Sequence, residues 1–344
     1  PEFGLTYREI EKDEFKIDAR IETLISSDTH VGIAKSVGLG VIGFADAYDR
    51  LRPDIVLVLG DRFEIFAATQ AAFFAGISVG HISGGEVTEG ALDDSMRHCI
   101  SKMARYHFVA AETYRSRVIQ LGEQPGSVFN VGDPGLDNIA DMSLLSRDDL
   151  GLKLGLNLLN PYFLVTYHPA TTGDLDLSRN VQALFDALDE FPDFNVLLTK
   201  SNADAGGRLV NAMVDAYSLA NPNRVFAVTS LGQLNYLSAL KSCEAVVGNS
   251  SSGIVEAPAM GVPTVNIGTR QLGRLKASSI VDCAEDLLSV RVALAKAVSS
   301  EFKKNAAQTQ SLYGNCDASK KILNKLLRVD VDKRYAKRFY DLPS

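Results

Sequence analysis

The stretch Ala245-Val-Val-Gly-Asn-Ser-Ser-Ser-Gly-Ile-Val-Glu-Ala-Pro258 is followed by a second apolar run, Pro263-Thr-Val-Asn-Ile-Gly268. Residues 245–247 predict a buried parallel strand, residues 248–252 a tight turn and residues 253–260 a short helix. Strand, turn and helix in this order indicate an α/β domain. The turn then carries its polar residues at the sheet edge where such domains bind ligands.

Three neighbouring hydroxyl groups, those of Ser250, Ser251 and Ser252, are expected at the N-terminus of this helix. Backbone N–H groups without partners and the positive end of the helix dipole stabilise a phosphate at such a position. Glu256 follows one turn later, where its carboxylate would repel a phosphate but could accept two hydrogen bonds from a ribose diol. The combination indicates a nucleotide site, and the simpler alternative is a serine N-cap on a surface helix.

Length and composition favour a soluble globular protein of two domains rather than a nucleic-acid-binding or membrane protein. The chain has 344 residues, which suits two α/β domains. A net charge of −7 disfavours nucleic acid and anionic membrane surfaces as partners, and no apolar run approaches the length of a membrane span. The four cysteines are scattered without a CxxC pair, which fits reduced thiols in a cytoplasm and predicts no metal site.

Strands and helices alternate in two series, which predicts two parallel sheets, each covered by helices on both faces. A polar connector at residues 144–161 separates the series. We therefore expect one domain at residues 1–155, rejoined by the tail 326–344, and a second at 156–325. The expected strands are 55–59, 77–82, 107–110 and 128–131 in the first domain, and 162–166, 195–198, 225–228, 245–247 and 264–267 in the second.

Carboxylates cluster where strands of the first sheet are expected to end. Asp61 and Arg62 follow the first strand, Glu86 lies in the turn after the second, and Asp93 and Asp94 open the next helix. Because the carboxyl ends of parallel strands share one edge, we expect these groups to lie close together. Neighbouring carboxylates raise one another's pKa, which suits acid–base catalysis, whereas capping of the helices is the alternative role.

Polar residues follow the strands of the second domain in the same way. His168 ends the strand at 162–166 and could donate to a phosphate or a departing oxygen at neutral pH. Asn202 and Asp204 follow the next strand, and Arg270 and Arg274 follow the strand after the serine turn. Arginines there could offset the charge of a diphosphate.

These residues together resemble the hydrolysing UDP-N-acetylglucosamine 2-epimerases of sialic-acid biosynthesis. The matching stretches cover nearly the whole chain in the family's order: Gly60-Asp-Arg-Phe, His81-Ile-x-Gly-Gly-Glu86, Asp93-Asp-Ser-Met-Arg-His98, His168-Pro, Asn202-x-Asp-Ala-Gly206, Gly248-Asn-Ser-Ser-x-Gly253 with Glu256, and Asn266-x-Gly-Thr-Arg-Gln-x-Gly-Arg274. The resemblance implies two Rossmann-like α/β domains in a GT-B arrangement, with the nucleotide bound mainly by the second domain and catalysis in the cleft. We also expect a homodimer or homotetramer.

The implied reaction is metal-free and needs no cofactor. Removal of the C2 proton and anti elimination of UDP give 2-acetamidoglucal, and rehydration gives N-acetylmannosamine. The residue predictions that follow are catalytic roles for Asp61, Glu86, Asp93, Asp94 and His168, and UDP binding by Arg62, Asn202, Asp204, Asn249, Ser250, Ser251, Glu256 and Arg270.

Two departures from the family pattern affect the first domain. Ser83 stands where the family often has a catalytic glutamate, so the base of each step stays open. The chain also begins after the strand and loop with which the family normally starts, and we expect the sequence to be incomplete there.

Three alternative functions remain open. The nearest is the same chemistry on UDP-2,4-diacetamido-2,4,6-trideoxyglucose, on the route to legionaminic acid. A GT-B glycosyltransferase would share the nucleotide loop but would have little use for paired carboxylates. A nucleotide-sugar sensor without activity would keep the binding residues alone.

Overall fold

A computed structural model describes residues 7–23, 30–88, 92–169, 177–201, 206–329 and 337–343. The chain divides into two compact units: unit 1 comprises residues 1–133 and 319–344, and unit 2 comprises residues 134–318. The sequence pattern instead predicts a boundary near residue 155. Residues 134–155 pack on unit 2 because Leu150 is fully buried in its core and the Leu145 N–H donates to Ser238 Oγ at 3.0 Å.

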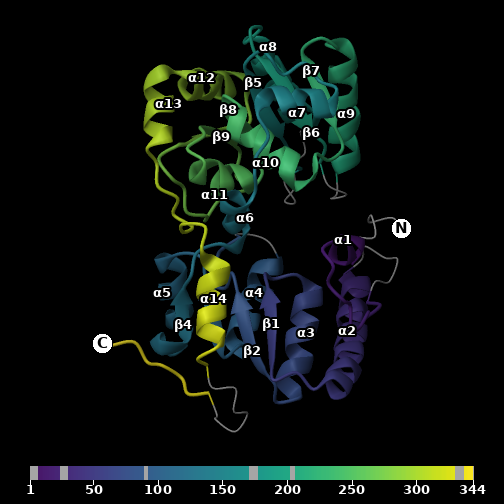
Figure 1. The fold of residues 1–344 in the computed structure, drawn as a ribbon, viewed down its shortest axis with the longest axis vertical. Coiled ribbons are helices and arrows are strands. Elements are labelled where there is room, and N and C mark those ends of the chain that lie inside the picture. Colours follow the sequence, from purple (N-terminus) through teal and green to yellow (C-terminus); the bar gives the residue numbers. More distant parts are fainter. Residues whose placement is uncertain are drawn as a thin grey trace. The chain divides into compact units, whose positions relative to one another are not determined.

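Unit 1 contains a parallel sheet whose four described strands lie in the order β1–β2–β3–β4 (Figure 1). Its strands are β1 (Ile55–Leu59), β2 (Ser78–Ile82), β3 (Tyr106–Val109) and β4 (Val128–Asn130), and its connecting helices are α3 (Phe63–Phe74), α4 (Leu92–Met103) and α5 (Glu112–Gln120). Strand β1 pairs only with β2 among the described strands. It therefore forms an edge of the described sheet, and Leu57 and Leu59 on it are 44% and 57% exposed.

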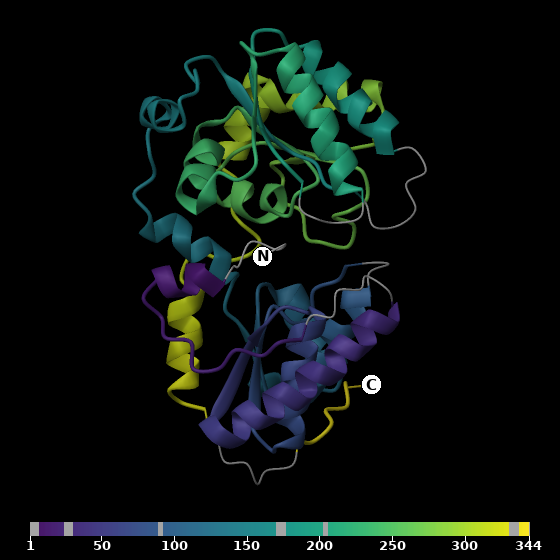
Figure 2. The same ribbon diagram turned by 90° about the vertical axis from the view of Figure 1, so that its right-hand side faces the viewer.

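The remaining elements of unit 1 surround this sheet. Helix α2 (His30–Leu51) packs against α3, and the two lie side by side in Figure 1. Figure 2 shows α2, in purple, along the side of unit 1 that faces the viewer. By length and composition, Val31–Leu51 is the one helix in the described part of the chain that could cross a membrane. Unit 1 also contains a short helix, α1 (Tyr7–Lys12), and a 3₁₀ turn, η1 (Pro125–Ser127). A second 3₁₀ turn, η2 (Pro134–Leu136), lies at the start of unit 2.

The end of the chain also packs on unit 1. Helix α14 (Ala318–Leu326) buries Ile322 against Tyr106 and Phe108 of β3. Further on, the Lys337 ammonium donates to the Ala104 carbonyl oxygen at 2.6 Å and pairs with the buried Glu123 carboxylate, also at 2.6 Å. Residues of the C-terminal tail therefore belong to the first unit.

Unit 2 contains a larger parallel sheet, whose described strands lie in the order β10–β9–β8–β5–β6–β7. They are β5 (Tyr162–Thr166), β6 (Asn195–Thr199), β7 (Val225–Val228), β8 (Ala245–Gly248), β9 (Thr264–Ile267) and β10 (Ile280–Cys283). The helices are α6 (Asp137–Asp141), α7 (Arg147–Leu154), α8 (Leu177–Asp189), α9 (Gly207–Ala220), α10 (Gly232–Ser242), α11 (Ser252–Ala259), α12 (Leu287–Val298) and α13 (Ser300–Ala307).

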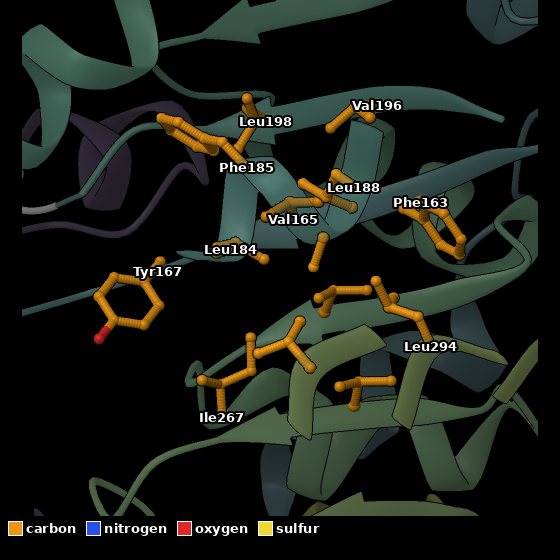
Figure 3. Close-up of a cluster of buried hydrophobic side chains, with 14 of the residues drawn as sticks. Phe163, Val165, Tyr167, Leu184, Phe185, Leu188, Val196, Leu198, Ile267 and Leu294 are labelled. Carbon is orange, nitrogen blue, oxygen red and sulfur yellow. The ribbon is translucent and has the colours of Figure 1, made fainter. Parts of the chain in front are cut away.

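Two hydrophobic cores cover the two faces of this sheet. Side chains alternate along a strand, so Phe163 and Val165 of β5 enter one core while Tyr162 and Leu164 enter the other. Figure 3 shows the first core, where β5 and β6 meet Leu184 and neighbouring residues of α8. Strands buried on both faces explain why their sequences read as continuous apolar runs.

Residues 285–302 contain α12 and the start of α13. The helices are separate because Ser299 is extended (φ −63°, ψ 142°) and its hydroxyl caps α13 by accepting from Phe302 N–H. Two elements of unit 2, strand β10 and helix α7, were not expected from the sequence. Strand β10 is only partly buried, and its sequence therefore lacks the continuous apolar run that indicates a buried strand.

Candidate active site

The order of strands in unit 2 reverses at its centre. From β5 the chain proceeds outward through β6 to β7, then returns to β8 on the other side of β5 and continues to β10. Ligands of open α/β sheets bind outside the carboxyl ends of the strands at such a switch point. His168 follows β5 and the serine turn follows β8, so the structure brings these two predicted sites together.

Gly248 allows the serine turn to lie close to β5. Its backbone has a φ of +127°, which side-chain-bearing residues rarely adopt, and a Cβ atom there would collide with the Thr166 carbonyl oxygen. The N–H of the next residue, Asn249, donates to that same oxygen at 3.2 Å. A glycine at this point therefore places the turn against the end of the neighbouring strand.

The side chain of Asn249 holds the main chain of His168. Its Oδ1 accepts from the His168 N–H and its Nδ2 donates to the His168 carbonyl oxygen, both at 2.7 Å. Asn249 is 1% exposed, and its own carbonyl oxygen accepts from Arg270 and Gln271. The amide predicted to bind UDP is thus engaged in fixing the serine turn to the histidine loop.

His168 and the serine turn line a cavity of about 400 Å³. The His168 side chain is 7% exposed, and its Nδ1 lies 3.1 Å from Ser201 Oγ. The lining residues are mostly polar and uncharged: Thr166, Thr199, Thr229, Ser230, Leu231, Gly232, Gln233, Tyr236, Ser250 and Ser252, together with His168 and Lys200. The Lys200 ammonium is paired with Asp215 at 2.7 Å.

Helix α11 begins at this cavity, and its serines do not form an ordinary N-cap. Ser251 occupies the N-cap position, but its side chain makes no capping hydrogen bond. Ser250 Oγ instead accepts weakly from the Ser252 N–H at 3.4 Å. Glu256 is half-buried on the same helix. The geometry therefore leaves the start of the helix suited to an external anion.

Unit 1 carries a charged cluster at the carboxyl edge of its sheet. The Arg97 guanidinium, 5% exposed, forms an ion pair with Asp61 and lies 3.4 Å from Asp94. It also donates to Thr88 Oγ1 at 3.1 Å, and Asp94 in turn accepts from the Thr88 N–H at 2.7 Å. Asp94 therefore holds the segment at Thr88 against α4, and Arg97 connects that segment to Asp61 after β1.

Asp93 differs from the two carboxylates that contact Arg97. Partial burial raises its pKa because the charged form is less well solvated, and the neighbouring negative charge of Asp61 raises it further. A carboxylate with a raised pKa beside a second, ion-paired carboxylate is an arrangement suited to proton transfer. The structure thus brings together three of the predicted catalytic residues of unit 1.

His81 connects the two elements that carry these carboxylates. Its ring is fully buried, with Nε2 2.9 Å from the Gly60 carbonyl oxygen and Nδ1 3.0 Å from Ser101 Oγ on α4. Burial lowers the pKa of His81 to about 3. The ring is therefore neutral at pH 7 and links the residue before Asp61 to the helix that bears Asp93 and Asp94.

The backbone of the turn after β2 is strained at Ser83, the position at which the sequence departs from the family pattern. Ser83 has a φ of +65°, which is uncommon for a residue other than glycine and occurs often at functional sites. Glu86, three residues later, is 7% exposed, and the Gly85 carbonyl oxygen accepts from Arg117. Arg62 points to solvent and pairs with Glu64 at 3.3 Å. Asn202 and Asp204 lie outside the described residues.

Comparison with known proteins decides the family. The model of the UDP-N-acetylglucosamine 2-epimerase family matches residues 1–327. The chain belongs to the UDP-N-acetylglucosamine 2-epimerase family. The resemblance carried by the sequence motifs is confirmed.

Two relatives have similar sequences over most of the chain. The GDP/UDP-N,N'-diacetylbacillosamine 2-epimerase (hydrolyzing) of Campylobacter jejuni is 39% identical over 343 residues, which cover 99% of this chain and 88% of that protein. The UDP-N-acetylglucosamine 2-epimerase of Neisseria meningitidis serogroup B is 32% identical over 281 residues, which cover 81% of this chain and 72% of that protein.

The fold of this chain is also shared with solved structures. The crystal structure of UDP-GlcNAc 2-epimerase from Neisseria meningitidis bound to UDP-GlcNAc aligns with a TM-score of 0.81 at 18% identity, covering 93% of this chain and 88% of that one. The predicted fold class, two Rossmann-like α/β units of GT-B type, is confirmed.

Sequence reasoning missed some residues of the candidate site. It gave Arg97 no role of its own, although the spacing of three and four residues from Asp94 and Asp93 places all three on one helical face. Tyr236 carries no sequence signal beyond that of a core aromatic residue. The contact between Asn249 and His168 joins residues 81 positions apart and has no local signature.

Proposed function

We propose that this protein is a hydrolysing 2-epimerase of a UDP-linked 2-acetamido sugar. The observation that carries the proposal is the position of Asp93, whose pKa is raised, beside the ion-paired Asp61 in unit 1. One carboxyl group that can hold a proton and a second that stays charged suit a reaction that removes and returns a proton. Family membership and the hydrolysing activity named for the Campylobacter jejuni relative support it.

The reaction has two steps. In the first, a base takes the proton from C2, the C2–H electron pair forms the C1=C2 double bond, and the C1–O bond breaks so that UDP leaves with its electrons. In the second, water adds its oxygen to C1 of the glycal, and C2 receives a proton on the face opposite to the one from which the first proton was removed. Asp61 and Asp93 are the proposed acid–base pair, and Glu86 and Asp94 stay predicted contributors.

Unit 2 is proposed to bind the nucleotide. The N-terminus of α11 and the hydroxyls of Ser250 and Ser251 would hold the diphosphate, stabilising the charge that develops as UDP departs. Glu256 is proposed to bind the ribose, His168 to donate to the leaving oxygen, and Arg270 to offset diphosphate charge. For Asn249, the contacts support a role in positioning His168.

The first substrate to test is UDP-N,N'-diacetylbacillosamine, the 2,4-diacetamido-2,4,6-trideoxy sugar. A relative named for this substrate shares 39% of its residues with this chain across almost the full length. UDP-N-acetylglucosamine is the second candidate, supported by the relative at 32% identity that is named for it. The two sugars differ at C4 and C6, whereas the chemistry at C1 and C2 is the same.

A single assay tests this function. The protein is incubated with each UDP-sugar in deuterated water, and UDP and free sugar are quantified by chromatography and mass spectrometry. We expect release of UDP together with the 2-epimeric free sugar carrying deuterium at C2. A product that is still UDP-linked, UDP release only when an acceptor sugar is present, or tight binding without release would contradict the proposal. The second and third results would favour the glycosyltransferase and the sensor, respectively.

The expectation of a homodimer or homotetramer also remains open to test. Light scattering after size-exclusion chromatography gives the mass in solution. A mass of two or four chains would agree with it, and a single-chain mass at working concentration would contradict it.

A further inference from the structure

Two buried hydroxyl groups in the unit 2 cavity have no hydrogen-bond partner among the described residues. One belongs to Tyr236 on α10 and the other to Ser252, the first residue of α11. Both residues line the cavity with His168 and Ser250, and Ser252 is 7% exposed. Buried polar groups in folded proteins almost always have a partner. Even if one of these hydroxyl groups donates to the other, one O–H is left to donate to a ligand.

The Tyr236 phenol lies beside the hydroxyls of Ser252 and Thr166 without a hydrogen bond of good geometry to either. The Thr166 hydroxyl is already bonded to that of Thr199. Burial raises the pKa of Tyr236 to about 12, so the phenol keeps its proton at neutral pH and can donate. Of these two neighbouring hydroxyl groups, that of Ser252 has no other partner in the described structure, so its Oγ is the acceptor assigned to Tyr236.

The position of Ser252 determines what its hydroxyl can bind. It begins α11, where backbone N–H groups and the helix dipole favour an anion. The cation that lines the cavity, Lys200, is paired with Asp215. Glu256 lies further along the same helix and would repel a phosphate. An anion is thus favoured at the Ser252 end of the helix and held by neutral donors.

We propose that Ser252 is a third hydroxyl ligand of the diphosphate and that Tyr236 orients it. Tyr236 O–H donates to Ser252 Oγ, and a rotation about the Ser252 Cβ–Oγ bond directs Ser252 O–H to a phosphoryl oxygen. Tyr236 is then a positioning residue that acts through Ser252. This inference rests on the proposed binding of a UDP-sugar by unit 2.

Calorimetric titration with uridine, UMP and UDP tests the assignment in the full-length protein. We expect Ser252→Ala to weaken UDP binding about tenfold or more, as for loss of a hydrogen bond to a charged group, and to leave uridine binding unchanged. Tyr236→Phe should weaken UDP binding by a smaller factor. The double variant should match Ser252→Ala alone, because Tyr236 acts through Ser252.

Tyr217→Phe is the matched control, because it removes a tyrosine hydroxyl of the same unit that bonds to Asp189 and does not line the cavity. We expect it to bind UDP as the wild type does. Unchanged UDP affinity in Ser252→Ala, equal losses for uridine and UDP, an additive double variant, or an equal loss in Tyr217→Phe would each overturn the inference. A wild-type protein that binds no UDP would overturn the proposed function as well.

Discussion

At the carboxyl edge of the unit 1 sheet, the Arg97 guanidinium joins the carboxylates of Asp61 and Asp94. At the corresponding edge of unit 2, the cavity is lined mainly by hydroxyl groups, and two of these, Tyr236 and Ser252, are buried without partners in the described structure. In unit 1 the charged groups are paired with one another, which suits groups that must keep a fixed position and exchange protons. A set of neutral donors suits an anion that arrives and leaves. The two units are therefore suited to different parts of one reaction.

Loss of the proton-transfer group should have the largest effect. Asp93→Asn keeps the shape of the side chain but removes its ability to carry a proton, so we expect kcat to fall by about 10² to 10⁴. The measurement is UDP release from the UDP-sugar, with circular dichroism to confirm folding. Asp286→Asn is a matched control, because Asp286 caps α12 of unit 2 and should leave kcat unchanged. A kcat near that of the wild type in Asp93→Asn would place the acid–base residue elsewhere.

The link between the serine turn and the histidine loop should matter next. Asn249→Ala removes the hydrogen bonds that Asn249 makes to the buried N–H and carbonyl groups of His168, and loss of such a bond costs about 1–3 kcal/mol. We expect a lower midpoint of urea denaturation and weaker UDP binding. A variant that loses stability but binds UDP normally would show that this link supports the fold alone and not the proposed nucleotide site.

The buried His81 should make unit 1 sensitive to acid. Its pKa is about 3 in the folded protein, where burial opposes the charged form and Arg97, His98 and His107 add repulsion. The unfolded chain binds a proton at about pH 6.5, so stability is complete above that pH and falls as the pH drops toward 3, by at most about 1.4 kcal/mol per pH unit.

The variant His81→Gln removes this titration while keeping a donor and an acceptor on the side chain. We therefore expect a shallower loss of stability between pH 6.5 and pH 4.5 than in the wild type, measured by urea denaturation. His107 also has a pKa lowered by burial, so part of the acid sensitivity should remain. Equal slopes for the two proteins would mean that His81 does not titrate on unfolding.

The smallest expected effect concerns the pH profile. Asp61 raises the pKa of Asp93, so Asp61→Asn should lower that pKa. We expect the acid limb of the residual kcat/KM to move to lower pH, because Asp93 then stays deprotonated to lower pH. An acid limb that stays in place, with kcat/KM measured from pH 5 to 8, would show that the two carboxylates do not interact.

Much of the fold could be predicted from the sequence, because strands such as β5 and β8 are buried on both faces and read as continuous apolar runs. Strand β10, with the sequence Ile-Val-Asp-Cys, is half-exposed and gave too weak a pattern. Helix α7 was taken for a connector because its burial depends on a core formed by distant residues. Burial of this kind is a tertiary property.

The candidate site could be predicted as a set of positions but not as a set of contacts. Strand ends marked Asp61, His168 and the serine turn, because a parallel sheet gathers its carboxyl ends at one edge. The role of Asn249 in holding His168 depends on the pairing of β5 with β8, which the sequence order does not reveal. The same pairing brings Thr166 to Gly248, and only a glycine tolerates that approach.

The division of labour between the two units is tested most directly by the dissociation constant of UDP for Asp93→Asn, measured by calorimetry. If unit 2 binds the nucleotide and unit 1 transfers the proton, this constant should stay within about twofold of the wild-type value, because removal of a group that acts in the transition state leaves ground-state binding intact. A loss of UDP affinity that matches the loss in kcat would contradict the account.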